Sequence, residues 1–285
     1  MKVEIVECPR DAMQGFESWI PTEDKILYMN QLLSCGFDVL DCGSLVSAKA
    51  IPQMADTEEV LQALHVGSSH TKLLVIVANK KGAQRAVHFP CIDFLGFPFS
   101  VSEEFQLRNT RRNREQAMQT LKAIVDMAHT AQKKVVAYVS MAFGNPYNEA
   151  WSVEIVAHWV EQIAALGVEV ISLSDTVGMA QPQDITTLFS QLIPAYPHIT
   201  LGAHLHTQPH NWKPVVEAAY DAGCRRFDGA ILGLGGCPMA THTLTGNLPT
   251  EHLLQFLNNR GVAHGVDPNE FDKARRMAQK TFPTH

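Results

Sequence analysis

Short apolar runs alternate with longer amphipathic segments along the whole chain. The apolar runs are rich in Val, Ile, Leu and Phe, and the segments between them, such as EDKILYMNQLLS and TEEVLQALH, repeat their apolar residues with helical period. We predict strands at residues 3–7, 38–42, 73–78, 91–97, 134–140, 169–174, 200–205 and 226–231. Strands that alternate with helices are typically parallel and are joined by right-handed crossovers.

Eight such strand–helix units in 285 residues predict a (β/α)8 barrel of the TIM type. The alternative is a doubly wound sheet, which usually has fewer strands and a glycine-rich first turn, whereas the first turn here is CPRDAMQG, without GxGxxG. No linker or shift in composition divides the chain, so we expect residues 1–285 to form a single catalytic domain. The tail, DPNEFDKARRMAQKTF, begins with an Asp-Pro helix start and predicts an additional C-terminal helix at about 267–281.

Composition and charge favour a small-molecule partner. The chain is 46% hydrophobic and 18% charged, which is typical of a globular protein with a substantial core, and its formal net charge is −6. Lys and Arg form no long basic run, so neither nucleic acid nor an acidic membrane surface is an expected partner.

A cytoplasmic location is expected from the first residues and from the cysteines. MKVEIVECPR lacks the apolar core of a signal peptide, and no window offers enough uncharged apolar residues for a membrane span. The six cysteines show no paired CxxC spacing, which argues against a zinc site. In a reducing compartment it also argues against a disulfide framework, so most should be buried thiols.

The polar residues at the predicted strand ends are the candidates for chemistry, because barrel active sites lie at the C-terminal ends of the strands. His204 and His206 are two residues apart on the seventh strand, so both side chains point to the same side and can chelate a cation. A carboxylate from another strand end, with Asp11 the obvious candidate, would complete a mixed nitrogen and oxygen site for Mg²⁺, Mn²⁺ or Zn²⁺.

Structural roles remain open for the same residues. A histidine pair on a strand is often hydrogen-bonded within the core, Arg10 can be a plain ion-pair partner, and Asp175 can cap the helix that follows the sixth strand. The basic stretch LRNTRRNREQ is typical of a solvated loop and helix start.

Six motifs together carry a family resemblance. VECPRDAMQG, LVSAKAIPQMAD, YVSMAFGNPYNE, LSDTVG, HLH and GLGGCPMA…TGN occur in this order and cover nearly the whole chain. In them the chain resembles the 3-hydroxy-3-methylglutaryl-CoA lyases, members of a metal-dependent barrel group that also contains isopropylmalate and homocitrate synthases; the cysteine of the last motif is specific to the lyase branch. The resemblance implies a (β/α)8 barrel and cleavage of 3-hydroxy-3-methylglutaryl-CoA to acetoacetate and acetyl-CoA. It also implies a divalent cation, Mg²⁺ or Mn²⁺, with Zn²⁺ possible in crystals.

The resemblance also implies an acyl-CoA partner, a homodimer, and a place in leucine degradation or ketone-body formation. One alternative is an acetyl-CoA-dependent Claisen-condensing acyltransferase of the isopropylmalate or homocitrate synthase type; the absence of a long region after the barrel favours the lyase. A lyase for a related 3-hydroxyacyl-CoA is another. A non-catalytic barrel that senses acyl-CoA or metal would be favoured if Arg10 or a ligand were missing, and none is.

On this resemblance the family's functional residues fall on named positions of the chain. The metal ligands are Asp11, His204, His206 and Asn247. The catalytic residues are Arg10, Cys237, His204 and Asp41. The substrate-binding residues are Arg10, Gln14, Ser44, Tyr147, Asp175 and Thr176.

The reaction gives several of these residues a role. Arg10 is expected to stabilise the enolate that leaves, because its guanidinium is always charged. His204 is a candidate general base, with Asp41 or a bound water as alternatives, since a metal-bound imidazole has one nitrogen occupied. Cys237 is expected to protonate the enolate or to exclude water, on a mobile glycine-rich loop at about 233–247.

Some positions depart from the family's usual pattern. Asp41 stands where the lyases usually have glutamate, Gly15 and Phe16 replace an asparagine and a glutamate, and Thr207 replaces an aspartate after the histidine pair. These changes bear on how the substrate is positioned, and so on the choice of acyl-CoA.

Overall fold

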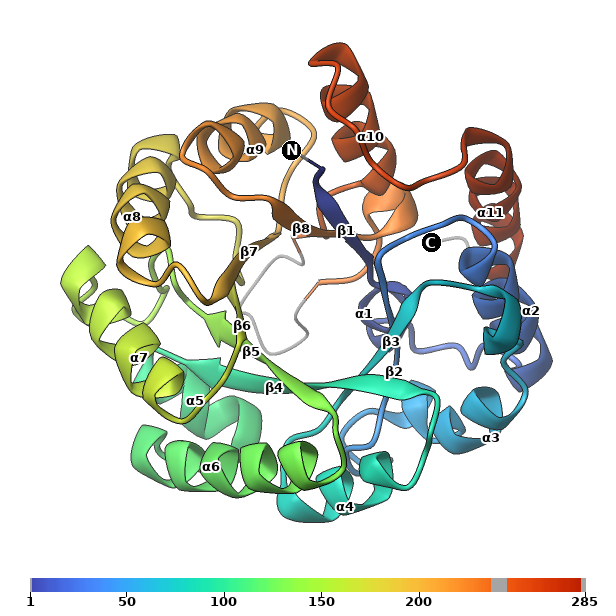
Figure 1. Ribbon diagram of the computed structural model, residues 1–285, viewed down its shortest axis with the longest axis horizontal. Helices are drawn as coiled ribbons and strands as arrows, with labels where there is room; N and C mark the ends of the chain where they lie inside the picture. The colour runs from blue at the N-terminus through green and yellow to red at the C-terminus, as the bar shows by residue number, and fades with distance from the viewer. Residues whose placement is uncertain (1, 237–244, 283–285) are drawn as a thin grey trace.

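Eight parallel strands close into a barrel in chain order, with β1 paired to both β2 and β8 (Figure 1). The computed structural model describes residues 2–236 and 245–282. The strands are β1 (Glu4–Glu7), β2 (Val39–Ser44), β3 (Lys72–Ile76), β4 (Ile92–Ser100), β5 (Lys134–Ser140), β6 (Val170–Asp175), β7 (Thr200–Leu205) and β8 (Arg226–Gly229). Each overlaps a predicted strand, so the (β/α)8 barrel is confirmed.

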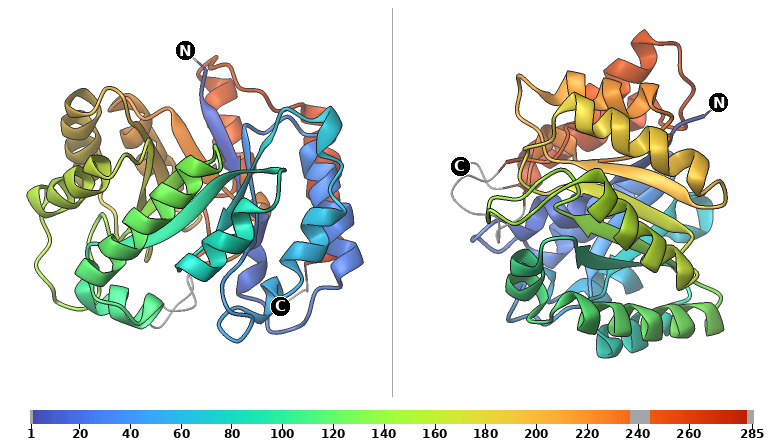
Figure 2. Two further views of the ribbon diagram at one scale, coloured as in Figure 1. Left: turned by 60° about the horizontal axis from the view of Figure 1, so that its bottom comes forward. Right: turned by 90° about the vertical axis from the view of Figure 1, so that its left-hand side faces the viewer.

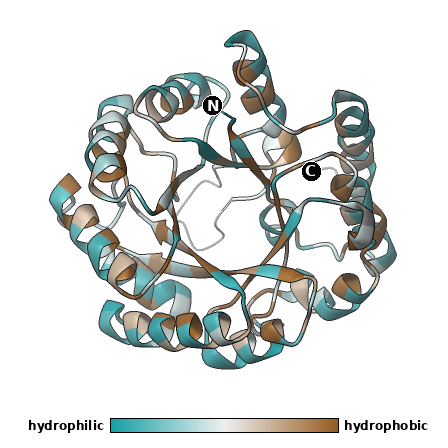
Figure 3. Cartoon of the chain, viewed as in Figure 1, coloured by the Kyte–Doolittle hydropathy of each residue, from teal (hydrophilic) through white to brown (hydrophobic). Residues whose placement is uncertain are grey.

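The helices form a ring outside the strands, seen from the side in Figure 2. They are α1 (Pro9–Gln14), α2 (Thr22–Leu33), α3 (Thr57–Gln62), α4 (Lys80–Val87), α5 (Glu103–Thr110), α6 (Arg114–Thr130), α7 (Val153–Ala165), α8 (Pro182–Ala195), α9 (Trp212–Asp221), α10 (Thr250–Asn259) and α11 (Pro268–Thr281), with short 3₁₀ turns η1 (Pro52–Met54), η2 (Val66–Ser68) and η3 (Ile231–Gly233). Figure 3 shows hydrophilic and hydrophobic stretches alternating along these helices, as their amphipathic period predicts. No helix in the described ranges is long and apolar enough to cross a membrane.

The predicted C-terminal helix is α11. The Asp267 side chain accepts hydrogen bonds from the backbone N–H groups of Asn269 and Glu270, which caps the first turn, and Pro268 follows it at a position where no N–H is needed. The helix packs against α2 and buries Phe271. The local cap and the apolar face that the sequence carries therefore determine this element.

The last predicted strand is two residues too long. The sequence predicts strand to residue 231, whereas β8 ends at Gly229 and η3 begins at Ile231. Leu232 has a φ of 67°, which a strand cannot contain, and its backbone N–H is held by the Glu251 carboxylate. The apolar run thus leaves the strand direction here and continues into η3.

Side chains of alternate strand residues fill the barrel interior. An apolar cluster inside the barrel consists of Val6, Cys8, Val39, Leu74, Ile76, Val136, Tyr138 and Val170. The other part of the interior is polar and comes from β6, β7 and β8, which contribute Ser172, His204 and Asp228, all buried. In the strand register, Ser172 lies beside Gly202 and His204 beside Asp228. His204 and Asp228 therefore stand on the polar side of the barrel interior.

Candidate active site

A cavity of about 140 Å³ opens at the C-terminal ends of the strands. Arg10, Asp11, His204 and His206 line it, as expected of residues that follow β1 or end β7. Apolar side chains of β3 and α5 complete the wall, among them Ile76 and Phe105. The cavity therefore offers a compact, charged group of side chains on an apolar background.

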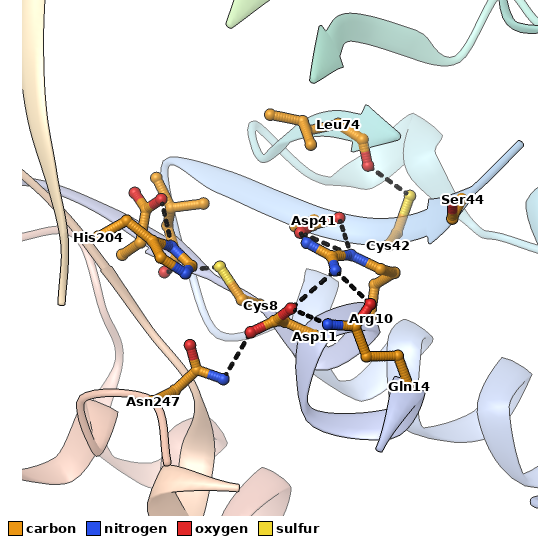
Figure 4. A network of polar contacts seen from close by, with 12 residues as sticks. Cys8, Arg10, Asp11, Gln14, Asp41, Cys42, Ser44, Leu74, His204 and Asn247 are labelled. Atoms are coloured by element: carbon orange, nitrogen blue, oxygen red, sulfur yellow. Dashed lines mark hydrogen bonds and ion pairs between the residues drawn. The ribbon is translucent and has the colours of Figure 1, made fainter. Parts of the chain in front are cut away.

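The local sequence after β1 places Arg10 and Asp11 side by side at the mouth of the barrel. Pro9 begins α1 directly after the strand, because its fixed φ suits the first helical turn, and α1 carries both charged residues in that turn. The Arg10 guanidinium donates to Asp41 from Nε (3.2 and 3.0 Å) and from Nη2 (2.6 Å), and from Nη1 to Asp11 (2.7 Å) and Gln14 (2.9 Å). Figure 4 shows this network joining the start of α1 to β2.

The two carboxylates that Arg10 contacts have different acidities. Burial raises the pKa of Asp11, but Arg10, His204 and His206 oppose it more strongly and lower that pKa to about 2. Burial raises the pKa of Asp41 to about 6, although Arg10 acts against it. Asp11 is therefore ionised at neutral pH and available as a ligand.

His204 and His206 point to the same side of the chain, with their Nε2 atoms 3.2 Å apart. The Nδ1 atom of His204 lies 3.1 Å from Oδ2 of Asp228. Burial lowers the pKa of His204, but the hydrogen bond to Asp228 and the negative charges of Asp228 and Asp11 together outweigh it, so the pKa is raised. For His206, burial and the neighbouring His204 lower the pKa to about 4. The pair therefore presents two nitrogens to one point.

The donor set fits a divalent cation. One ligand atom each from Asp11, His204 and His206 lies within 4.8 Å of the others, and all three residues are buried. Asn247 lies beside them, since its Nδ2 donates to Asp11 Oδ2 (2.8 Å) and to the Leu234 carbonyl (2.8 Å). Carboxylate oxygen with imidazole nitrogen suits a cation of Mg²⁺, Mn²⁺ or Zn²⁺ type.

At two positions of the predicted mobile loop, Gly235 and Gly246, a larger side chain would collide with neighbouring backbone atoms. Gly235 has a φ of 91°, and a Cβ there would lie 2.5 Å from the Asp11 carbonyl oxygen. A Cβ on Gly246 would lie 2.2 Å from the carbonyl oxygen of Gly233. The described ends of the 233–247 loop are thus packed closely on each other and on α1. Cys237, the predicted proton donor, lies outside the described residues.

The structure brings Gln14 and Thr176 to the cavity, but Ser44, Tyr147 and Asp175 do not line it. Ser44 ends β2 and is buried, with its N–H donating to Thr57 Oγ1 (3.2 Å). Tyr147 lies with its ring 4.9 Å from the Arg108 guanidinium carbon.

Asp175 closes the turn after β6, where its carboxylate accepts from the N–H groups of Met179 and Ala180 (2.9 Å each). It holds the loop that precedes α8, and Gln181 is the N-cap residue of that helix. Burial raises the pKa of Asp175 to about 6. The contacts of Asp175 therefore anchor the loop before α8. This structural role resembles the helix-capping role that the sequence left open for it.

Sequence reasoning missed Asp228 and Tyr138. Asp228 holds His204, and the ring of Tyr138 lines the cavity with its centroid 5.6 Å from that of His204. Side chains alternate between the two faces of a strand, and the neighbours of both residues point outward. This period of two could have predicted that Asp228 and Tyr138 point into the barrel. Asp228 could have been found because it is a charged residue inside a strand that was predicted to be buried. A charge at such a position indicates a partner inside the barrel.

Known proteins are similar to this chain over nearly all of its length. The family model described as HMGL-like matches residues 2–278. The cytoplasmic 3-hydroxy-3-methylglutaryl-CoA lyase of Rattus norvegicus is 33% identical over 93% of this chain and 77% of its own length, and the mitochondrial hydroxymethylglutaryl-CoA lyase of Mus musculus is 33% identical over 93% and 81%. The structure of an HMG-CoA lyase from Acinetobacter baumannii, in complex with coenzyme A and 3-methylmalate, superposes with a TM-score of 0.91 and 32% identity, covering 98% of this chain and 91% of that one.

Proposed function

The chain belongs to the HMGL-like family, among its hydroxymethylglutaryl-CoA lyases, and from this we infer that it cleaves 3-hydroxy-3-methylglutaryl-CoA to acetoacetate and acetyl-CoA. The observation that carries the inference is the convergence of the Arg10 guanidinium and the Asp11, His204 and His206 donor atoms on one cavity. The protein is thus a carbon–carbon lyase that acts on an acyl-CoA.

Cleavage beside a tertiary alcohol needs a base for the hydroxyl proton, an electron sink for the departing thioester carbanion, and a proton for that carbanion. We propose that Asp11, His204, His206 and Asn247 hold a divalent cation, Mg²⁺ or Mn²⁺ by preference, with Zn²⁺ possible in crystals. When bound, such a cation supplies a Lewis acid that lowers the pKa of the substrate hydroxyl. The mixed oxygen and nitrogen donor set supports this choice.

Arg10 is suited to the electron-sink role because its position is fixed. Asp41 holds Nε and Nη2, while Asp11 and Gln14 hold Nη1, so the plane of the guanidinium is set from two sides. A planar cation held in this way can stabilise the oxygen anion of an enolate without reorganising. We therefore propose that Arg10 contacts the thioester oxygen.

The proton acceptor is His204, Asp41 or a bound water. Nδ1 of His204 is held by Asp228, so ligation and proton transfer would both use Nε2 and exclude each other. Both carboxylate oxygens of Asp41 accept from Arg10, and Asp41 is fully buried, but its pKa of about 6 suits a base near neutral pH. Asp41→Asn distinguishes the two residues: if Asp41 is the base, the acidic limb of the kcat profile disappears, and if His204 is, the limb stays.

The proposed roles of the remaining site residues are not equally well supported. Gln14 and Thr176 line the cavity and can contact the acyl group, which supports their substrate roles. Ser44, Tyr147 and Asp175 keep only the support of the sequence motifs. Cys237 remains the proposed proton donor to the enolate on the same basis.

The lyase proposal is tested against the synthase alternative by product analysis. Purified protein with Mn²⁺ should release acetoacetate and acetyl-CoA from 3-hydroxy-3-methylglutaryl-CoA, and should form no CoA thiol from acetyl-CoA and 2-oxo acids. A panel of 3-hydroxyacyl-CoA thioesters tests the related-lyase alternative. Condensation without cleavage, or faster cleavage of another thioester, would displace the proposed substrate.

A homodimer, a cytoplasmic location and a place in leucine degradation or ketone-body formation complete the proposal. The rat relative is named as cytoplasmic, which supports a cytoplasmic location for this chain. The mouse relative is named as mitochondrial and does not support it. Sedimentation of the purified protein tests the dimer.

A further inference from the structure

Arg226 is a charged residue of the barrel interior that the proposed reaction does not use. It begins β8, is 1% exposed, and is among the largest fully buried side chains in the part of the chain that the structure describes. Its Nη1 pairs with Glu4 of β1, at the end of the barrel away from the active site. Its Nε and Nη2 have no hydrogen-bond partner among the described residues. A guanidinium buried in this way is costly unless a nearby charge compensates it.

The neighbouring strand makes room for this side chain. A Cβ at Gly202 of β7 would lie 3.0 Å from Cδ and 3.2 Å from Cγ of Arg226, and 3.3 Å from the Ser172 hydroxyl of β6. The aliphatic part of the Arg226 side chain therefore lies against β7, in the space that the glycine leaves. Its direction is fixed by packing, and it runs beneath the catalytic face.

Asp228 supplies a second compensating charge, in addition to that of Glu4. It lies two residues after Arg226, on the same side of β8, and is 1% exposed. Burial lowers the pKa of Arg226, and Asp228 is the largest influence that raises it. Asp228 Oδ2 accepts from His204 Nδ1 (3.1 Å) and from Ser172 Oγ (3.4 Å), while Oδ1 has no partner among the described residues. Arg226 and Asp228 thus have unused polar atoms in the same interior.

We propose that Arg226 and Asp228 are a positioning pair: Arg226 is the counter-charge of the Asp228 carboxylate, and Asp228 holds His204 with its proton on Nδ1. Their polar atoms meet through an internal water, which commonly pairs buried groups of this kind. His204 Nε2 is then left without a proton, on the side of His206 and Asp11.

The orientation matters because a neutral imidazole carries one proton. With that proton on Nδ1, Nε2 keeps a lone pair for a cation or for a substrate proton. With the proton on Nε2, His204 would turn an N–H toward His206 Nε2, 3.2 Å away, and could do neither. Arg226 acts through Asp228 and His204, so it is a positioning residue. Its catalytic consequence rests on the proposed function, whereas the orientation of His204 does not.

The experiment compares Arg226→Gln with Arg226→Lys, which keeps the charge. Arg225→Gln is the matched control, because Arg225 is the adjacent residue and, within the described ranges, donates only to the carbonyls of Tyr220 and Cys224. Two readouts are independent of activity: long-range ¹⁵N correlation spectra of the metal-free protein, which report the tautomer of His204, and the Kd of Mn²⁺ by electron paramagnetic resonance. Circular dichroism and Tm establish that each variant is folded.

Arg226→Gln should move His204 away from the Nδ1–H tautomer and weaken Mn²⁺ binding roughly tenfold, as loss of an outer partner of a metal-binding histidine does. Arg226→Lys should recover most of the affinity, and Arg225→Gln should match the wild type. In an Asp228→Asn background, Arg226→Gln should have no further effect on either readout. A folded Arg226→Gln protein with wild-type tautomer and Kd, whatever its Tm, would overturn the proposal.

Gly202→Ala keeps the proposal testable if Arg226→Gln does not fold. The added methyl displaces Arg226 and leaves every charge in place, so a smaller shift of the same two readouts is expected. An unchanged tautomer and Kd in Gly202→Ala would also contradict the proposal. If the wild type fails to cleave 3-hydroxy-3-methylglutaryl-CoA while these readouts respond as described, the positioning pair stands and only the proposed function fails.

Discussion

Replacing Arg10 by methionine removes a single uncommitted donor from the place where we propose that the enolate forms. A guanidinium has five N–H bonds. The contacts with Asp41, Asp11 and Gln14 use Nε–H, one N–H of Nη2 and both of Nη1, which leaves one N–H, on Nη2, uncommitted among the described residues. Removal of one donor to a developing oxygen anion lowers kcat by about 10²–10³-fold. Because this donor is charged, we expect the upper end, about 10³-fold or ~4 kcal/mol.

Arg10→Met should also change stability with pH in a defined direction. It leaves Asp41 buried without its cation, so the pKa of Asp41 rises above its value of about 6. A carboxyl whose folded pKa is raised contributes stability at low pH and loses it as pH increases through that pKa. The Tm difference from wild type should therefore be larger at pH 8 than at pH 6.

The assay measures kcat, the Kd of Mn²⁺ and Tm for Arg10→Met, with Arg276→Met as the control. Arg276 is an exposed residue of α11 that pairs only with Asp272 among the described residues, and its removal should leave all three quantities nearly unchanged. Mn²⁺ affinity of Arg10→Met should fall no more than about tenfold, because Asp11 is retained. A folded Arg10→Met protein with kcat within tenfold of wild type would refute the enolate role.

The remaining predictions concern Glu7 and Gly235, which contact described residues next to the site. Glu7 accepts from Ile231 N–H (2.8 Å) and from Thr250 Oγ1 (2.6 Å). Burial raises the pKa of Glu7 from 4.5 to about 8. The free energy of unfolding of the wild type should therefore fall between those pH values by at most ~1.4 kcal/mol per pH unit. Glu7→Gln should flatten that dependence in urea titrations; an unchanged slope would contradict the neutral carboxyl. Gly235→Ala should cost on the order of 1–3 kcal/mol and weaken Mn²⁺ binding, whereas Gly15→Ala, with no atom within 4 Å of the added Cβ, should not. Equal effects of the two substitutions would show that the close contact at Asp11 is unimportant.

The sequence carried enough information for the barrel because each element is locally determined. Period-two and helical-period segments alternate without interruption, and caps such as Asp267 mark where a helix begins. The end of β8 was predicted wrongly because an apolar run does not reveal the positive φ of Leu232, which the contact with Glu251 supports. Local pattern thus predicts elements better than the points where tertiary contacts end them.

The candidate site was predictable where spacing alone sets geometry. His204 and His206 share a side because they are two residues apart, and Asp11 lies in the first turn of α1, the helix that follows β1. The partners of these groups depend on barrel closure, which brings β8 beside β7 and so Asp228 to His204. No spacing in the sequence encodes that contact.

The central claim is that a cation held by Asp11 and the two histidines makes this barrel a lyase. The most direct measurement titrates Mn²⁺ into metal-free protein and follows bound metal and acetoacetate release from 3-hydroxy-3-methylglutaryl-CoA together. Acetoacetate release should rise with occupancy of one site per chain and vanish when a chelator removes the metal, and His206→Ala should lose both signals. Undiminished release from exhaustively chelated protein, or full occupancy without release, would contradict the account.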